Sequence, residues 1–557
     1  MVRRRRKEAK TEEAKPKQSA AAVDKLLRYG GFAVGGLVAV LAIVYLTTML
    51  PGVSDGDSAE LQYNSKILGV CHPPGYQIEV TFGKVFSMLP FGTSVAWRIN
   101  FMMAVFGVFG CLAIYGAVRR ITGFVVPGIV AAGTLGFSSI YWTHCLQAEA
   151  YVFYGAFLAI SVYTFVRYIE GGRFWWLYLT ALAAGICVSD RASELFVMPG
   201  FVLVLLFALK KIKWNRVAAV HFITAVVIFV LPFVYTVCFH LARTDKEYLH
   251  YRDNRIRDSV LSAKGFTEFE PRKKIRRYLV EAVVRLKLGM TYTKDAKFDG
   301  KVVGRDIDKY AWLLSGAGGF GNRYEGKTDA MSMHMSREQG QGTSIGLLGL
   351  VLGVGAVAVW RKNYGWVLLG VWFFAGNTIF ILWHHRWDNL TFTIPGLIGL
   401  SILAGLGAVG PSRWGIEKRR YIFQLCCLLA PLFLLATNYR YMDMSTAETK
   451  KTLEYNEKIA QADWPKGCAF IDGYWPGMTL RYLFYVEAGR QDIHVVYKDD
   501  RKQWGKLIDH FSNNGREVFM RSQYLGNIGY EQKKYYAGRT KKEFLQLGFV
   551  RVDNPQR

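Results

Sequence analysis

Long apolar runs separated by short polar connections dominate the 557-residue chain. Each run holds roughly 17 to 23 residues with few charges, which is long enough for a helix to cross about 30 Å of hydrocarbon. The eleven runs cover residues 29–49, 99–117, 124–142, 150–168, 174–189, 194–210, 217–239, 343–360, 364–383, 392–410 and 420–437. The pattern predicts an all-α polytopic membrane protein with about 11 transmembrane helices.

The charges of the connections predict the orientation of these helices. The polar tail over residues 1–28 begins with the basic run Arg3-Arg4-Arg5-Arg6-Lys7, which favours the cytoplasmic side. Counting from there, every connection assigned to the cytoplasm is basic, and the opposite connections are acidic or mixed. We therefore expect a multipass protein of the inner (plasma) membrane, or of the ER membrane in a eukaryotic cell, with a cytoplasmic N-terminus.

Two longer segments fall on the outer side of the membrane. Residues 241–342 combine basic helical sequence with a glycine-rich stretch, and residues 438–557 contain short strand patterns at 469–471 and 493–497 beside helical patterns at 476–487 and 501–513. The second segment predicts a small extracytoplasmic α/β domain, placed periplasmic in a bacterium. The expected parts are a cytoplasmic tail (1–28), a transmembrane module (29–240) with its first loop at 50–98, an extracytoplasmic loop (241–342), further transmembrane helices (343–437) and the α/β domain (438–557).

The composition narrows the range of functions. The net charge is +27, but the sequence has no recognition helix, zinc-finger spacing or RNA-binding motif, so nucleic acid is not an expected partner. Its basic residues instead follow the topology of the membrane loops. Eight cysteines without a C-x-x-C pair indicate neither a disulfide framework nor a zinc site.

The first outer loop carries the most unusual polar sequence. Asp55, Asp57 and Glu60 form a carboxylate cluster beside the bilayer, where charges are costly and usually functional. The run from Cys71 to Tyr76 then contains two prolines and a glycine, which predict a sharp turn into an amphipathic segment at 76–89. We expect an interfacial helix pair, with His72 either catalytic or simply capping the turn.

Further polar side chains fall on the same face of the membrane, although they are far apart in sequence. They are Asp55, Asp57, His72, Glu149, Asp190, Arg191, His385, Arg386 and Asp388. One interpretation is a shared pocket, in which Asp57 removes a proton from an attacking hydroxyl while Arg191, Arg386 and His385 stabilise a departing phosphate. The alternative is that they are ordinary solvated loop ends.

Three motifs resemble a known family. They are Gly56-Asp57-Ser58-Ala59-Glu60-Leu61, then Leu68-Gly69-Val70-Cys71-His72-Pro73-Pro74-Gly75-Tyr76, and then Ala96-Trp97-Arg98-Ile99-Asn100. The chain is similar here to the transmembrane protein 260-like O-mannosyltransferases, glycosyltransferase family 117 of the GT-C superfamily, as a bacterial member. Supporting matches are Trp142-Thr143-His144, Gln147-Ala148-Glu149-Ala150-Tyr151, and Asp388 before Ile394-Pro395-Gly396.

The resemblance implies a GT-C-like helix bundle and an inverting sugar transfer outside the cytoplasm. The donor would be a polyprenyl-phosphate-linked monosaccharide in the bilayer, and the acceptor a hydroxyl of an exported protein or glycan. Asp57 occupies the position of the catalytic base, with Asp55 in reserve and Glu60 beside it. The expected substrate-binding residues are His72, Tyr76, Glu149, Asp190, Arg191, His385, Arg386 and Asp388. No required cofactor is expected, although the carboxylates suit a divalent metal.

Two other classes of protein fit parts of the pattern. A transporter or lipid flippase also places ionisable residues near membrane spans, but we find no internal repeat, and the charges lie at loop ends on one side. A non-catalytic envelope scaffold fits everything except the concentration of carboxylates.

Overall fold

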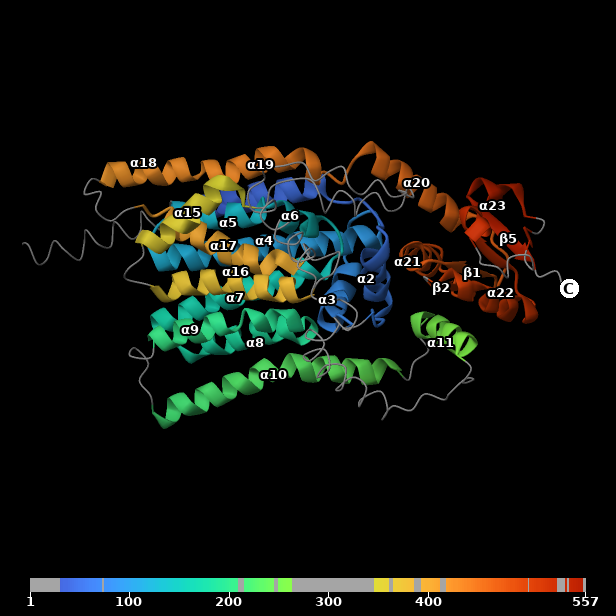
Figure 1. Cartoon of the computed structure of the whole chain (residues 1–557), viewed down its shortest axis with the longest axis horizontal. Helices are drawn as coiled ribbons and strands as arrows, with labels where there is room; N and C mark the ends of the chain where they lie inside the picture. Colours follow the sequence, from blue (N-terminus) through green and yellow to red (C-terminus); the bar gives the residue numbers. More distant parts are fainter. Residues whose placement is uncertain are drawn as a thin grey trace, which may run out of the picture.

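The computed structural model of the chain describes residues 31–72, 75–208, 215–244, 249–262, 345–359, 364–384, 392–410, 417–498, 500–527, 536–537 and 540–553. The predicted loop at 241–342 and the predicted site residues His385, Arg386 and Asp388 therefore lie largely or wholly outside the described residues. Figure 1 shows a helical bundle with a smaller α/β domain at one end.

The bundle consists of apolar helices that overlap every predicted span. They are Gly31–Thr48, α4 (Val95–Thr122), α5 (Val125–Gly136), α6 (Ser139–Leu146), α7 (Ala150–Gly171), α8 (Phe174–Asp190), the 3-10 helix η1 (Ala192–Phe196), α9 (Pro199–Ala208), α10 (Arg216–Thr244), α15 (Gly346–Val359), α16 (Tyr364–His384), α17 (Ile394–Gly407), α18 (Glu417–Cys427) and α19 (Leu429–Met442). In the described part of the chain, six helices are long and apolar enough to cross a membrane, or seven if α5 and α6 form one span. The chain is a multipass membrane protein, with several spans shorter than predicted.

The predicted span at 124–142 is bent instead of straight. The axes of α5 and α6 meet at 66°. A break in a membrane helix frees backbone carbonyls, which must find new donors away from water. The Tyr45 hydroxyl donates to the carbonyl of Gly136 (2.8 Å), and the Asn438 amide donates to that of Phe137 (2.7 Å). Side chains of neighbouring helices thus donate to the backbone carbonyls at the bend.

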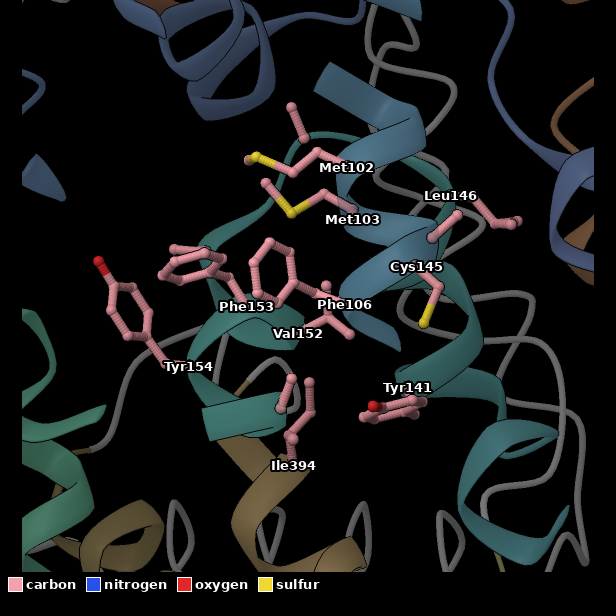
Figure 2. Close-up of a cluster of buried hydrophobic side chains, with 14 of the residues drawn as sticks. Met102, Met103, Phe106, Tyr141, Cys145, Leu146, Val152, Phe153, Tyr154 and Ile394 are labelled. Carbon is pink, nitrogen blue, oxygen red and sulfur yellow. The ribbon is translucent and has the colours of Figure 1, made fainter. Parts of the chain in front are cut away.

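Large side chains between α4, α6, α7 and α17 form the part of the core that lies beneath the first loop (Figure 2). Phe106 of α4 and Phe153 of α7 pack edge to face with their ring centroids 4.6 Å apart. Tyr141 and Cys145 of α6 and Ile394 of α17 are also buried here. Such aromatic packing adds stability beyond the burial of apolar area. It gives the first loop a rigid support.

The first loop forms the predicted helix pair, α2 (Gly56–Ile67) and α3 (Gln77–Ser87). Both helices lie at the end of the bundle nearest the α/β domain (Figure 1). The left-handed backbone of Leu68 ends α2, and Gly75 (φ +111°) and Tyr76 (φ +54°) precede α3. A left-handed backbone is uncommon for a large residue such as Tyr76, so the bundle must hold this turn in place.

The C-terminal segment forms the predicted α/β domain. Its strands are β1 (Ala469–Asp472), β2 (His494–Tyr497), β3 (Val518–Arg521), β4 (Tyr536–Ala537) and β5 (Phe549–Asp553), in the order β2-β1-β3-β5-β4. Strand β1 runs parallel to β2 and β3, whereas β5 is antiparallel to β3 and β4. The remaining elements are α20 (Ala447–Gln461), α21 (Tyr474–Tyr482), the π-helix η4 (Leu483–Glu487), η5 (Arg501–Gln503), α22 (Trp504–Asn513), η6 (Ser522–Asn527) and α23 (Lys542–Gln546).

Two helices join this domain to the bundle. Helix α21 packs on α2, and α11 (Leu249–Leu261), which follows the span of α10, packs on β2 and α22. Ile256 and Val260 of α11 contact the apolar cluster of the domain. The first loop is therefore enclosed between the bundle and the α/β domain.

Candidate functional site

Helix α2 presents its two carboxylates, Asp57 and Glu60, on one face. Asp57 and Glu60 are three residues apart, a spacing that places side chains as neighbours on a helix. The Glu60 side chain is fully buried, and that of Asp57 is 33% exposed. Asp57 is thus the carboxylate of this pair that a substrate can reach.

Glu60 binds His72 through both of its oxygens. Oε1 accepts the backbone N–H of His72 (2.9 Å), and Oε2 lies 2.5 Å from Nδ1 of the ring. Because an ionised carboxylate only accepts, the proton of this contact is assigned to Nδ1. In the structure, Glu60 holds the imidazole of His72, whereas one interpretation of the sequence had His72 only capping the turn. The catalytic role expected for Glu60 stays a prediction.

A residue of the α/β domain completes this cluster. The Tyr474 hydroxyl donates to Oδ1 of Asp57 (2.6 Å) and lies 3.2 Å from Oε2 of Glu60 and 3.3 Å from Nδ1 of His72. Sequence reasoning missed Tyr474. It follows β1 directly, and functional side chains often lie at the carboxyl end of a parallel strand, so the signal was present.

Three side chains of metal-binding type meet in this cluster. Ligand atoms of Asp57, Glu60 and His72 lie within 4.8 Å of one another. The Tyr474 hydroxyl lies among them, at 2.6 to 3.3 Å, whereas a magnesium or zinc ion requires about 2.0 to 2.2 Å to each ligand. With Tyr474 in place, the arrangement fits a hydrogen-bond network better than a metal centre.

Asp55 lies close to this cluster but lines a different surface. It borders a groove against α20, together with Thr449, Asn456 and Thr479. Burial raises the pKa of Asp55 to about 7, and the charge of nearby Asp57 acts in the same direction. The carboxyl group is therefore largely neutral below pH 7 in the folded protein.

The contribution of Asp55 to the stability of the folded protein should therefore decrease as the pH rises from about 4 to about 7. In the unfolded chain Asp55 ionises near pH ~4, so the folded state binds the extra proton over this range and loses its advantage as the pH rises. The three-unit difference corresponds to roughly 4 kcal/mol. We expect Asp55→Asn to unfold at a higher temperature than the wild type at pH 8 and at the same temperature at pH 4. An equal offset at both pH values in thermal unfolding would contradict this assignment.

Tyr76, Arg191 and Glu149 lie around the cluster. Burial raises the pKa of the Tyr76 hydroxyl well above its usual value, Arg191 opposes this rise, and Asp57 adds to it, so Tyr76 stands near both charges. Glu149 Oε1 accepts a hydrogen bond from Ser58, the residue after Asp57 (2.9 Å). These residues, predicted from distant loops, come together near α2.

Arg191 is held between aromatic rings. Its guanidinium carbon lies 4.1 Å from the ring centroid of Tyr151 and 5.0 Å from that of Phe392. Its Nε is 3.8 Å from Glu194 Oε1, and the side chain is 6% exposed. The two rings hold the guanidinium in place, and a guanidinium can bind an oxyanion through its N–H groups.

The structure does not test four of the predicted site residues. Asp190 ends α8, but its side chain is not among those described. His385, Arg386 and Asp388 fall in the range 385–391, outside the described residues. Their roles stay predictions.

The part of the sequence that contains several of the site residues matches a known family. Residues 57–215 match the model of the Protein O-mannosyl-transferase TMEM260 N-terminal domain. This segment begins at Asp57 and includes Glu60, His72, Glu149 and Arg191. The match confirms the TMEM260-like resemblance that the motifs indicate.

Two relatives agree with this match. The protein O-mannosyl-transferase tmem260 of Dictyostelium discoideum is 31% identical over 180 residues, which are 30% of this chain and 22% of the relative. The Mus musculus protein O-mannosyl-transferase TMEM260 is 34% identical over 142 residues, 25% of this chain and 20% of the relative. The matched region thus spans about a fifth of the length of these TMEM260 relatives.

Solved structures resemble the whole chain more distantly. The crystal structure of ArnT from Cupriavidus metallidurans bound to undecaprenyl phosphate is 12% identical, with a TM-score of 0.47, and the alignment covers 93% of this chain and 97% of that one. The Archaeoglobus fulgidus oligosaccharyltransferase complex with Zn and sulfate is 11% identical, with a TM-score of 0.47 and coverage of 90% and 71%. At these low values, no residue roles are taken from either structure.

Proposed function

We propose that the chain is an integral-membrane inverting glycosyltransferase of the TMEM260 type. It transfers a monosaccharide from a polyprenyl-phosphate donor to a hydroxyl of an exported protein or glycan. The observation that carries this proposal is the partly exposed Asp57 at the start of the segment that matches the family model, held by Tyr474 next to the Glu60–His72 pair. A carboxylate that is held in place and open to substrate suits a general base.

In the proposed reaction, Asp57 takes up the proton that the acceptor hydroxyl loses. The acceptor oxygen attacks the anomeric carbon of the sugar, and its proton passes to Asp57. The bond from that carbon to the phosphate oxygen breaks, and the electron pair leaves with the lipid phosphate. Because a phosphate leaves as a stable anion, the reaction needs cations near it more than a strong acid. Arg191 is the described cation that we assign to this role, with Arg386 and His385 as further candidates.

Arg191→Ala should mainly weaken the use of the donor. The variant removes the guanidinium that is stacked on Tyr151, so both the binding of the phosphate and the stabilisation of the developing charge are lost. We expect kcat/KM for the lipid-linked donor to fall by roughly 10²-fold or more. Arg191→Lys is the matched control, because it keeps the charge and loses the planar group. Donor kinetics unchanged in the alanine variant would contradict this role.

The proposal includes the orientation and the cofactor requirement. The basic connections assigned to the cytoplasm support a periplasmic or lumenal position for α2 and the α/β domain, where exported acceptors occur. We propose that the reaction requires no metal, since the three possible ligands already contact one another and Tyr474 through hydrogen bonds. The polyprenyl chain of the donor would lie in the bilayer beside the bundle.

A transfer assay with purified protein tests this function. Labelled polyprenyl-phosphate mannose, the donor suggested by the names of the relatives, is supplied with a serine- and threonine-containing peptide in detergent. Sugar on the peptide, detected by mass spectrometry, is the expected result. Uptake of a solute into vesicles without sugar transfer would overturn the proposal in favour of a transporter. Mass spectrometry of exported proteins with and without this chain would identify the natural sugar and acceptor.

A further inference from the structure

Tyr474 reaches Asp57 from a part of the chain 417 residues away. Its hydroxyl lies 2.6 Å from Oδ1 of Asp57, the shortest of its three contacts in the cluster. A hydrogen bond of this length to a carboxylate is among the strong ones in proteins. It joins the α/β domain to the proposed base.

The phenol acts as the donor in this contact. Burial raises the pKa of Tyr474 well above its usual value, and the charges of Glu60 and Asp57 raise it further. The hydroxyl therefore keeps its proton over the working pH range. With one proton, it donates to Asp57, while Nδ1 of His72, whose proton is directed to Glu60, lies 3.3 Å away.

The position of Tyr474 is fixed by the docking of α21 on α2. Trp475 packs on Gly56 so closely that a Cβ atom there would lie 1.7 Å from the indole ring. Thr479 donates to the carbonyl of Ser54 (3.1 Å), and the Tyr482 hydroxyl accepts from the backbone N–H of Ala96 (2.8 Å). Contacts along the whole helix thus hold the phenol in register with the carboxylate.

We propose that Tyr474 is a positioning residue for the transfer reaction: its hydroxyl holds Oδ1 of Asp57, so that Oδ2 is the oxygen that receives the proton of the acceptor hydroxyl. The inference rests on the proposed function, because it assigns a role to Tyr474 through Asp57 as the base. It also makes the α/β domain a part of the active site, although that domain lies outside the segment that matches the family model.

The hydrogen bond has a measurable electrostatic consequence. A phenol that donates to a carboxylate favours the ionised form, so loss of the bond should move the acid limb of the activity profile to higher pH. Titratable groups near Asp57 in the described residues include Asp55, Glu60, Cys71, His72, Tyr76 and Glu149. Glu60 and His72 also contact the Tyr474 hydroxyl, so the shift reports loss of the phenol from the cluster, in which the contact with Asp57 is the shortest.

The test compares Tyr474→Phe with Tyr455→Phe in purified, full-length protein. Both variants remove one hydroxyl from the α/β domain, but that of Tyr455 donates to the carbonyl of Leu547 (2.8 Å) within the domain. We expect Tyr474→Phe to move the acid limb of the kcat/KM profile up by about one pH unit and to lower the plateau kcat roughly tenfold, with KM for the donor unchanged. Tyr455→Phe should leave the acid limb in place.

A second variant keeps the shape of the side chain. 3,5-Difluorotyrosine at position 474 makes the phenol a stronger donor, so the acid limb should move down instead of up. This variant decides the matter if Tyr474→Phe does not fold. An unshifted limb in both Tyr474 variants, or an equal shift in Tyr455→Phe, would overturn the inference.

Asp57→Asn, measured alongside, separates this inference from the proposed function. If Asp57→Asn is inactive and the Tyr474 variants behave as wild type, only the positioning role fails. If Asp57→Asn keeps near-normal transfer, the assignment of the base fails, whatever the Tyr474 variants show.

Discussion

Replacing Asp57 with asparagine should abolish sugar transfer while leaving the protein folded. The amide keeps the shape of the side chain and can still accept from Tyr474, but it cannot take a proton from the acceptor hydroxyl. General-base catalysis contributes roughly 10²–10⁴-fold, and we expect a loss of this size in kcat. The measurement is transfer from a lipid-linked donor to a peptide, with thermal unfolding of the same sample as the check on folding.

The control for Asp57→Asn is the same change at an exposed carboxylate. Asp463 is 90% exposed and, among the described residues, pairs only loosely with Lys541 (3.4 Å). Asp463→Asn should keep wild-type kcat. Near-normal transfer by Asp57→Asn would show that another group is the base, and Asp55 would be the first to test.

Gly56→Ala should separate the α/β domain from the first loop. The backbone at Gly56 is left-handed (φ +53°), and an alanine Cβ would lie 1.7 Å from Trp475. The left-handed backbone costs about 1–2 kcal/mol for alanine, and overpacking adds about 1–3 kcal/mol. We expect a loss of roughly 2–5 kcal/mol in the free energy of unfolding and a strong loss of transfer, because Tyr474 moves away together with Trp475.

Gly172→Ala separates the two costs of this change. Gly172 also has a left-handed backbone (φ +63°), but nothing lies within 4 Å of the position of its Cβ. It should lose only the backbone part, about 1–2 kcal/mol, and keep its activity. Equal effects of the two substitutions in unfolding and transfer assays would show that Trp475 does not constrain Gly56.

Local patterns in the sequence were sufficient to predict much of the fold. Apolar length gave the positions of the helices, and the prolines and glycine before Tyr76 gave the α2–α3 pair. The strands at 469–472 and 494–497 were visible as short apolar runs. The bend between α5 and α6 was not visible, because it depends on donors from Tyr45 and Asn438, which are remote in sequence.

Only part of the site could be predicted from the sequence, for the same reason. The carboxylates of α2 and His72 are close in sequence, so their spacing indicated a shared role. Tyr474 is remote from both, and no pattern in the chain pairs the α/β domain with α2 in particular. Asp55 was the reserve choice beside Asp57, yet it precedes α2 and lines the groove against α20.

The separation of 417 positions between the cluster and Tyr474 also matters during biosynthesis. The ribosome must translate the described helices of the bundle before the phenol emerges, so a nascent chain with these helices inserted still lacks one residue of the proposed site. Premature termination upstream of Tyr474 would accordingly give an inserted but inactive product.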